Sequence, residues 1–413
     1  MRAWVEQKAG RDGATRLAGL GSDTLLGPFA LEQRAAMLLA TRKVDQAMAL
    51  VPKVLASAGG RETRLRLAYA AMLARAGKAD RARALLAEGD DPALKRLDLR
   101  RPQPGIAIDT PAAGFAELLV GLAVTLSQGN DRAFPLALVQ VARHAAPANS
   151  EATILLGLLL DRHGREPDAL AAVETVPAND PFIDDARDLA ARLLLDAKRG
   201  PEALARTSQV AALPSASAID HGRHGNVLDE LGRHAEAAEA YGRAAAIAAR
   251  EGGTNLWTWH LLRAAQLDEV DRWPEARAEL EKGLALAPDQ PLLLNYLGYS
   301  SLERGEKLDE AEKMIRRALE LRPGDASITD SLGWELYKRG RLPEAIEALS
   351  KAAADESAET EIHEHLGDAL YRAGRRYEAR FAWRAALLTA EEEETKRIEA
   401  KIASGWTEAT AAP

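Results

Sequence analysis

The chain has 413 residues, with 54 Lys and Arg against 62 Asp and Glu, a formal net charge of −8, and no Cys. The lack of Cys excludes disulfides, thiolate metal sites and cysteine nucleophiles, and interspersed charges of both signs argue against nucleic-acid binding. Aromatic residues make up only 5% of the chain, while Leu, Ala, Arg and Glu dominate, which is typical of helices packed on helices.

The N-terminal residues carry neither the apolar core of a signal peptide nor a lipidation Cys. The chain as given is therefore expected to be cytoplasmic, and a periplasmic location is the alternative if the N-terminus is truncated. The apolar runs 118–126 and 154–160 are too short to span a bilayer, so we expect no direct membrane insertion. Residues 1–87 are predicted to form N-terminal helix pairs, of which the first is incomplete.

Residues 88–113 contain Pro92, Pro102, Pro104 and Pro111 and cannot be regular helix. A surface crossing loop within one continuous array is favoured here, and a domain boundary remains the alternative.

Degenerate helix pairs are predicted for residues 114–250, where Ala169, Ala203 and Ala237 recur every 34 residues. A turn is expected at 129–131, and residues 251–254 lengthen a later connection. Pro135 stands where a small residue is expected, which is tolerable only in the first turn of a helix. The pair around residues 193–210 keeps Ala203 but lacks the leading Gly, so it is expected to pack more loosely.

Residues 251–389 carry the best-formed pairs. A Leu-Gly pair occurs at 297–298, 332–333 and 366–367, and Ala311, Ala345 and Ala379 follow at intervals of 34 residues. Small residues at this spacing let two helices approach closely. The pattern resembles the tetratricopeptide repeat (TPR) family, and this resemblance implies an all-α fold, a right-handed α-solenoid of stacked antiparallel helix pairs called a TPR superhelix.

Residues 390–413 begin with the acidic run 391–394, followed by Lys396 and Arg397. Acidic residues near the start of a helix and basic residues further along it interact favourably with the helix dipole. This order therefore predicts a helix that caps the end of the array. We expect the last ten residues to be disordered.

The TPR resemblance implies that the first helix of each pair lines a concave groove. The inward positions at which we expect a partner to bind are Asn295, Tyr299, Asp330, Trp334, Tyr337, Lys338, Glu364, Asp368, Tyr371 and Arg372. Aromatic anchors beside fixed charges are typical of peptide-binding hot spots. The alternative is that Trp334 and Tyr337 pack against neighbouring helices, and the sequence alone does not decide between the two.

Catalytic signatures such as a Walker loop, a dinucleotide fingerprint, a nucleophile elbow or paired metalloprotease histidines are missing from the sequence. His221 and His224 can share a helix face but have no third ligand nearby. We therefore expect no catalytic residues, no metal and no cofactor. An enzyme with a site in the irregular region 88–147 is the alternative.

Four segments carry a more specific resemblance: 295–300 (Asn-Tyr-Leu-Gly-Tyr-Ser), 330–334 (Asp-Ser-Leu-Gly-Trp), 365–368 (His-Leu-Gly-Asp) and 380–383 (Arg-Phe-Ala-Trp). They resemble a group of proteobacterial envelope TPR proteins that includes the lipoprotein adaptor of a carboxyl-terminal processing protease. The resemblance implies a non-catalytic scaffold or adaptor that binds a protein or peptide partner, such as an envelope protease or its substrates. The lipidation Cys of these adaptors is absent here.

Two further hypotheses concern other partners. Asn226 and Asn295 are isolated matches to the Lys-Asn-Arg clamp that holds chaperone tails in some TPR proteins, and the required lysines are missing. The chain is expected to be a monomer or a weak homo-oligomer, and a self-associating structural solenoid remains an alternative function.

Overall fold

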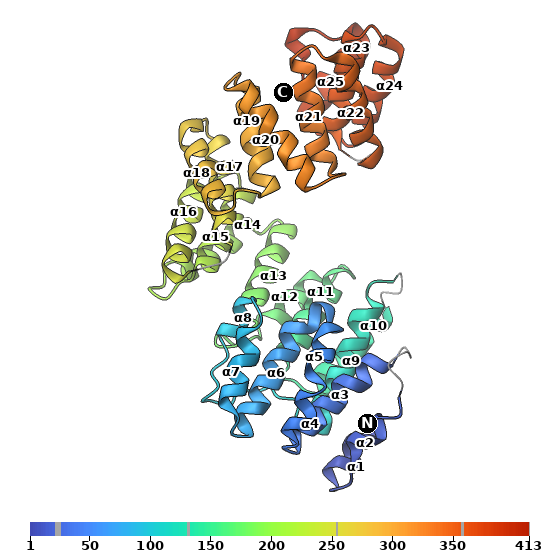
Figure 1. The fold of residues 1–413 in the computed structure, drawn as a ribbon, viewed down its shortest axis with the longest axis vertical. Coiled ribbons are helices and arrows are strands. Elements are labelled where there is room, and N and C mark those ends of the chain that lie inside the picture. The colour runs from blue at the N-terminus through green and yellow to red at the C-terminus, as the bar shows by residue number, and fades with distance from the viewer. Residues whose placement is uncertain (21–25, 130–132, 253–254, 357–358, 413) are drawn as a thin grey trace. The chain divides into compact units, whose positions relative to one another are not determined.

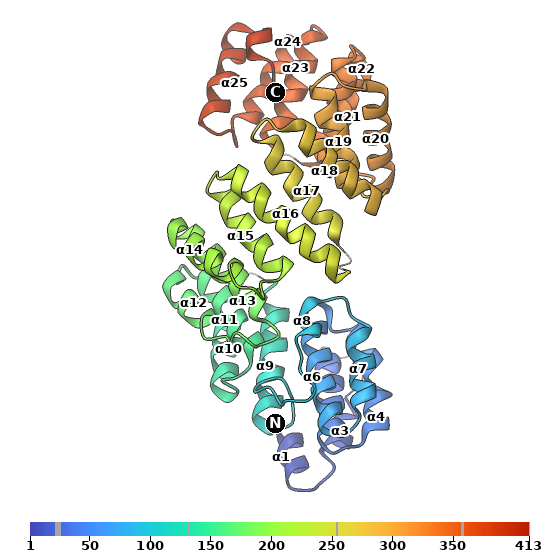
Figure 2. The same ribbon diagram turned by 90° about the vertical axis from the view of Figure 1, so that its left-hand side faces the viewer.

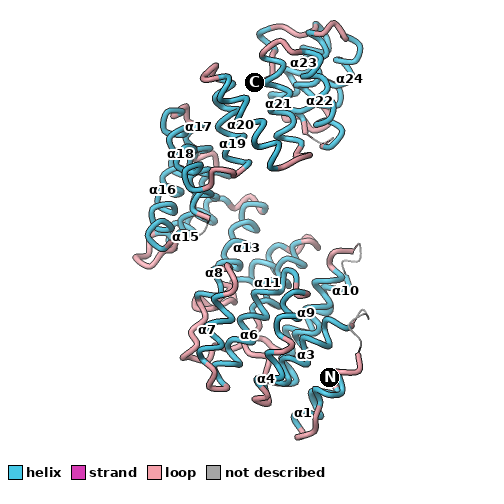
Figure 3. The backbone as a smooth tube through the Cα atoms, viewed as in Figure 1, coloured by secondary structure: helices cyan, strands magenta, loops and turns pink. Residues whose placement is uncertain are grey.

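The structure is a computed structural model that describes residues 1–413 except 21–25, 130–132, 253–254, 357–358 and 413. All regular elements of the described residues are helices, as Figure 3 shows. The chain divides between Leu231 and Gly232 into two compact units. The expected features at 129–131 and 251–254 lie partly outside the described residues, and the predicted limits at residues 87, 113, 250 and 389 stay predictions.

Unit 1 covers residues 1–231. Its helices are α1 (Arg2–Lys8), α2 (Gly13–Leu17), α3 (Gly27–Ala40), α4 (Val44–Met48), α5 (Val51–Ala56), the 3-10 helix η1 (Gly59–Arg61), α6 (Glu62–Arg75), α7 (Ala79–Ala87), α8 (Pro92–Lys95), α9 (Pro111–Leu126), α10 (Ala133–Ala145), α11 (Ser150–Asp161), α12 (Glu166–Val173), α13 (Ile183–Asp196), α14 (Gly200–Ala211) and α15 (Ala218–Glu230).

Unit 2 covers residues 232–413. Its helices are α16 (His234–Glu251), α17 (Leu256–Asp268), α18 (Trp273–Leu286), α19 (Pro291–Glu303), α20 (Leu308–Leu321), α21 (Ala326–Lys338), α22 (Leu342–Asp355), α23 (Thr360–Arg372), α24 (Arg376–Ala386), α25 (Glu392–Ser404) and the 3-10 helix η2 (Glu408–Thr410).

Helices of unit 2 pack as hairpins, α17 with α18, α19 with α20, α21 with α22 and α23 with α24. Figure 1 and Figure 2 show α21 and α22 side by side, with α23 and α24 beyond them. The first helices also contact one another, α19 with α21 and α21 with α23. Each hairpin therefore stacks on the next, and the predicted all-α solenoid of helix pairs is confirmed. The hand of the superhelix stays a prediction.

The Leu-Gly pairs determine how closely the two helices of a hairpin approach. At Gly333 of α21, an added Cβ would lie 2.6 Å from Leu349 Cγ of α22. At Gly367 of α23, it would overlap the Trp383 indole of α24. Such distances leave no room for a side chain, so these glycines are required by packing.

In unit 1, the Pro-rich residues 88–113 pack onto the helices rather than leaving the fold. Ile106 and Ile108 are buried, and α8 lies within the segment. Arg64 of α6 donates hydrogen bonds to the backbone oxygens of Gly105 (3.0 Å) and Ile106 (2.7 Å). Pro135 lies in the first turn of α10, where proline is tolerated.

Candidate partner-binding site

The positions predicted to bind a partner lie on the first helices of three consecutive hairpins. Asn295 and Tyr299 are on α19; Asp330, Trp334, Tyr337 and Lys338 are on α21; Glu364, Asp368, Tyr371 and Arg372 are on α23. Because these helices contact one another in order, the ten residues form one series, which we call the α19–α23 face.

Two of the four aromatic residues on this face are buried. Trp334 is 0% exposed, and its ring stacks on Tyr337 at 4.5 Å between centroids and on His365 at 3.9 Å. Trp334 Nε1 donates a hydrogen bond to Glu303 Oε1 (2.7 Å). Of the two alternatives that the sequence left open for Trp334 and Tyr337, the structure shows packing against neighbouring helices, because both rings are buried between α19, α21 and α23.

Tyr299 and Tyr371 are half-buried. The Tyr299 hydroxyl donates to Glu361 Oε1 (3.0 Å), and burial together with the Glu361 and Glu303 carboxylates raises its pKa. The Tyr371 ring lies 5.5 Å from the Trp383 ring. Both tyrosines therefore keep part of their surface accessible.

Two exposed cations lie over the buried rings. Lys338 Nζ is 4.9 Å from the Trp334 ring centroid and 3.2 Å from Glu303 Oε2. The Arg372 guanidinium carbon is 4.9 Å from the Tyr337 ring centroid. Cation–π contacts of this kind fix the position of a long side chain, so these charges are held in place at the surface.

Asp330 and His365 form a buried pair between α21 and α23. His365 Nδ1 donates to Asp330 Oδ2 (2.9 Å). Burial alone would lower the pKa of His365, but the carboxylates of Asp330, Glu361 and Asp368, with Asp330 contributing most, together outweigh burial, and the pKa is raised. Asp330 therefore holds a neighbouring helix and is not free to bind a partner.

Glu364 and Asp368 bind α25 through buried ion pairs. Glu364 accepts two hydrogen bonds from Arg397 (2.9 and 2.7 Å) and one from Lys401 (2.7 Å). Lys401 also lies 2.8 Å from both oxygens of Asp368. Burial opposes ionisation of Glu364, yet the bonds from Arg397 and Lys401 lower its pKa. The predicted capping helix is thus joined to α23 by charge.

Sequence reasoning missed Arg397 and Lys401 as members of this cluster, although the repeat contains a signal for them. Arg397 follows Glu364, and Lys401 follows Asp368, by 33 residues each, close to the repeat period. The spacing of the repeat therefore continues into α25.

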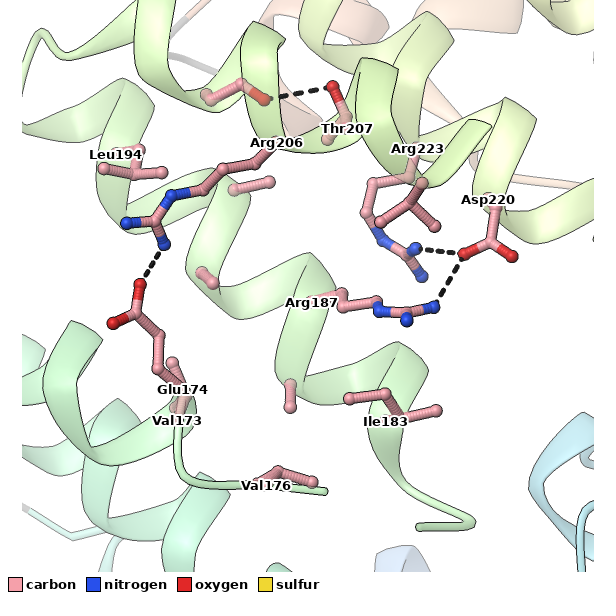
Figure 4. A pocket seen from close by; sticks show the side chains of 15 residues that line it. Val173, Glu174, Val176, Ile183, Arg187, Leu194, Arg206, Thr207, Asp220 and Arg223 are labelled. Atoms are coloured by element: carbon pink, nitrogen blue, oxygen red, sulfur yellow. Dashed lines mark hydrogen bonds and ion pairs between the residues drawn. The ribbon is translucent and has the colours of Figure 1, made fainter. Parts of the chain in front are cut away.

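A separate pocket of about 210 Å³ lies in unit 1 among α12, α13, α14 and α15 (Figure 4). Its apolar lining includes Ala186, Ala190, Ala191 and Ala203, small side chains that leave space in the pair predicted to pack loosely. The charged lining residues are paired, as Figure 4 shows: Arg206 with Glu174, and Arg187 and Arg223 with Asp220. This arrangement offers no unpaired acid or base for catalysis.

A second buried cluster in unit 1 extends into the irregular region 88–147 through Glu117. Arg61 pairs with Glu32 (3.0 Å), Glu117 (2.6 Å) and Glu151 (3.0 Å). Arg64 also pairs with Glu117. Burial raises the pKa of Glu32 to about 7, with Glu117 and Glu151 adding to the shift and Arg61 opposing it. These contacts tie α3, α6, α9 and α11 together.

Comparison with known proteins identifies the repeat. Residues 262–326 match the tetratricopeptide repeat, and residues 333–374 match a second TPR repeat description. The chain carries tetratricopeptide repeats. Over 95 residues, 22% of the chain, it is 37% identical to a TPR repeat-containing protein of Pseudomonas aeruginosa, of which the match covers 16%.

The fold is also similar to a solved structure. The crystal structure of yeast Tom70 matches 98% of this chain and 93% of its own chain, with a TM-score of 0.51 and 13% sequence identity. At this identity the likeness concerns the fold alone, a solenoid of TPR helix pairs.

Two kinds of feature are absent from the part of the TPR chain that the structure describes. Three or more His, Asp or Glu side chains do not meet there in a way that could hold a metal ion. Among the same residues, no helix has the length and apolarity needed to cross a membrane.

Proposed function

We propose that this TPR chain is a non-catalytic scaffold whose α19–α23 face binds a segment of a partner protein. The observation that carries the proposal is the placement of Lys338 and Arg372. Both cations are exposed, yet each is held over a buried ring, and the half-buried Tyr299 and Tyr371 lie on the same face. Fixed charges beside partly accessible aromatic rings lower the entropy cost of binding.

Buried rings contribute indirectly in this proposal. Trp334, Tyr337 and His365 form a rigid stack between the helices, and the charged groups rest on it. A partner would contact Lys338, Arg372 and the tyrosine edges, while the stack keeps them in position.

Site-specific photo-crosslinking tests the proposal. A photoreactive residue placed at Lys338 is expected to crosslink a partner in the source cells. The matched control is Arg384 of α24, an exposed arginine whose guanidinium carbon lies 5.9 Å from the Phe381 ring on the second helix of the pair. Equal crosslinking from both positions, or none from Lys338, would contradict binding at this face.

The resemblance of segments 295–300 and 330–334 favours an envelope carboxyl-terminal processing protease, or its substrates, as the partner. This identity rests on the resemblance and is part of the proposal. Purified protease from the source organism should bind the chain in a titration, and the complex should crosslink through position 338. Cell fractionation would decide between the cytoplasm and the periplasm.

A further inference from the structure

Residues 405–412 fold back from α25 onto α23. Gly405 ends α25 with φ at +91°, a conformation that side-chain-bearing residues rarely adopt. An added Cβ at Gly405 would also overlap the Tyr371 hydroxyl. Glycine at this position therefore lets the chain turn and lie directly against Tyr371, one of the predicted partner-binding residues. The sequence predicts disorder here, and the structure instead describes a packed segment.

The returning segment supplies two hydrogen bonds to one oxygen atom. Trp406 Nε1 donates to Asp368 Oδ2 (3.0 Å), and the backbone N–H of Ala412 donates to the same atom (3.0 Å). Lys401 Nζ contacts both Asp368 oxygens, while Trp383 Nε1 donates to Oδ1 (2.9 Å). Asp368 is 0% exposed, so these contacts enclose the carboxylate.

A compact turn brings the two donors together. Thr407 and Thr410 bond to each other through side chain and backbone at 3.0 to 3.2 Å, around the 3-10 helix η2. The turn places Trp406 and Ala412, six positions apart, at the same oxygen. Asp368 Oδ2 therefore accepts hydrogen bonds from two donors of one short segment, first a tryptophan indole N–H and then, six residues later, a backbone N–H.

The α19–α23 face also contacts Trp406 through its ring. The Arg372 guanidinium carbon lies 5.9 Å from the Trp406 ring centroid and 4.9 Å from that of Tyr337. Residues 405–412 thus contact Asp368, Tyr371 and Arg372, three of the positions predicted from the sequence to bind a partner.

We propose that Asp368, Tyr371 and Arg372 form a recognition site for a peptide segment that presents a tryptophan indole N–H and a backbone N–H, and that residues 405–412 fill this site in cis. The proposal rests on the proposed scaffold function and names its partner class. A carboxylate-bearing segment does not fit at Oδ2, because the atom is an acceptor and needs donors. A partner segment of the right chemistry would displace residues 405–412.

Competition in cis has a measurable consequence. A segment tethered by a short linker acts at an effective concentration on the order of millimolar. The wild-type chain should therefore bind the same peptide weakly in trans, and loosening its own segment should expose the site.

The test uses the full chain and a fluorescein-labelled synthetic peptide of residues 404–412, with fluorescence anisotropy as the readout. The variant Trp406→Ala is expected to bind the peptide at least tenfold more tightly than wild type. A peptide with Phe in place of Trp keeps the ring, lacks the indole donor, and should bind at least tenfold more weakly. The control Tyr377→Ala, at a residue of α24 that is 75% exposed, should behave as wild type.

Equal peptide affinity for wild type and Trp406→Ala, or for the Trp and Phe peptides, would overturn the proposal. Trp406→Phe replaces Trp406→Ala if circular dichroism shows that the alanine variant has lost its fold. Hydrogen exchange gives an independent check: the Ala412 amide should exchange slowly in wild type and at least tenfold faster when the peptide is added at saturation. Unchanged exchange would also overturn the proposal.

This outcome is separable from that of the scaffold proposal. If the peptide does not bind but a partner still crosslinks through position 338, the recognition site at Asp368 is wrong and the scaffold function stands. If the peptide binds as expected but no partner crosslinks through position 338, the recognition chemistry stands and the scaffold function is wrong.

Discussion

The indole of Trp334 lies on the imidazole of His365, with ring centroids 3.9 Å apart and planes 13° from parallel. Trp334 belongs to α21 and His365 to α23, so the stack joins the first helices of two consecutive TPR hairpins. Asp330 fixes the imidazole and Glu303 fixes the indole N–H through hydrogen bonds. The stack and these two hydrogen bonds together connect α19, α21 and α23.

His365 is expected to make the stability of unit 2 depend on pH. Its pKa is raised above the ordinary value of 6.5, so the folded state holds the proton more tightly than the unfolded state. The stabilisation is complete below pH 6.5 and is lost as the pH rises through the folded pKa. Urea unfolding from pH 5.5 to 9, followed by tryptophan fluorescence, should show this decrease in wild type and a clearly smaller one in His365→Gln.

Tryptophan fluorescence reports on unit 2, because six of the seven tryptophans follow residue 231. In the control His363→Gln, the same substitution is made at a histidine of α23 that does not belong to the stack. The decrease in stability with rising pH should persist in this variant. A decrease of the same size in His365→Gln would show that the buried pair is not its source.

The glycines of the Leu-Gly pairs should be intolerant of a methyl group. Gly367→Ala would force Cβ into the Trp383 indole, and overpacking of this kind costs roughly 1–3 kcal/mol. Gly60→Ala is the control, since an added Cβ there meets nothing within 4 Å and φ is not positive, so its effect should stay within about 0.5 kcal/mol. Urea denaturation measures both, and equal effects would contradict the close-packing argument.

Much of the fold could be predicted from the sequence because the repeat is encoded in small residues. Gly333, Gly367, Ala345 and Ala379 identify the helix contacts directly, since small side chains recur at a regular spacing where two helices of each repeat must approach closely. The order and pairing of helices in residues 291–386 followed from that spacing.

Burial depth on the α19–α23 face could not be predicted in the same way. The position of a residue within the repeat predicts on which side of its helix the residue lies. It does not predict how much of the side chain is buried by the next helix. The Trp334 ring is buried because Tyr337 and His365 stack on it. Tyr337 lies three residues later on α21, whereas His365 lies on α23. The fold-back of residues 405–412 depends on Gly405, which does not stand out in a polar segment, and on Asp368. The sequence marks Asp368 as a partner-binding position but does not show that residues of the same chain contact it.

Glu32 should give unit 1 its own pH dependence. Burial raises the pKa of this carboxyl from 4.5 to about 7, so the folded state retains a proton that the unfolded state loses. The free energy of unfolding should therefore decrease as the pH rises from about 4.5 to about 7. Glu32→Gln should remove this decrease and be more stable than wild type at pH 8, by roughly 1–3 kcal/mol.

Hydrogen exchange of peptides from α3 and α6 measures this effect within unit 1. The control Glu62→Gln alters a partly exposed carboxylate that pairs with Arg66 on α6 (2.8 Å), and should leave the pH dependence unchanged. If Glu32→Gln is no more stable than wild type at pH 8, then ionisation of Glu32 does not destabilise the folded chain and the prediction is wrong.

Lys401 should be the most sensitive charged residue of α25. Its ammonium is buried, with side-chain exposure of 0%, and pairs with Glu364 and Asp368. Lys401→Met would leave two buried carboxylates with fewer cations, and breaking a buried pair on one side costs about 3–5 kcal/mol. Lys396→Met, on the same helix, removes only an exposed pair with Glu392 (3.0 Å) and should cost less than about 1 kcal/mol. Urea unfolding followed by tryptophan fluorescence compares them; similar costs would mean that Lys401 acts as an ordinary surface lysine and that α25 is held by its apolar contacts.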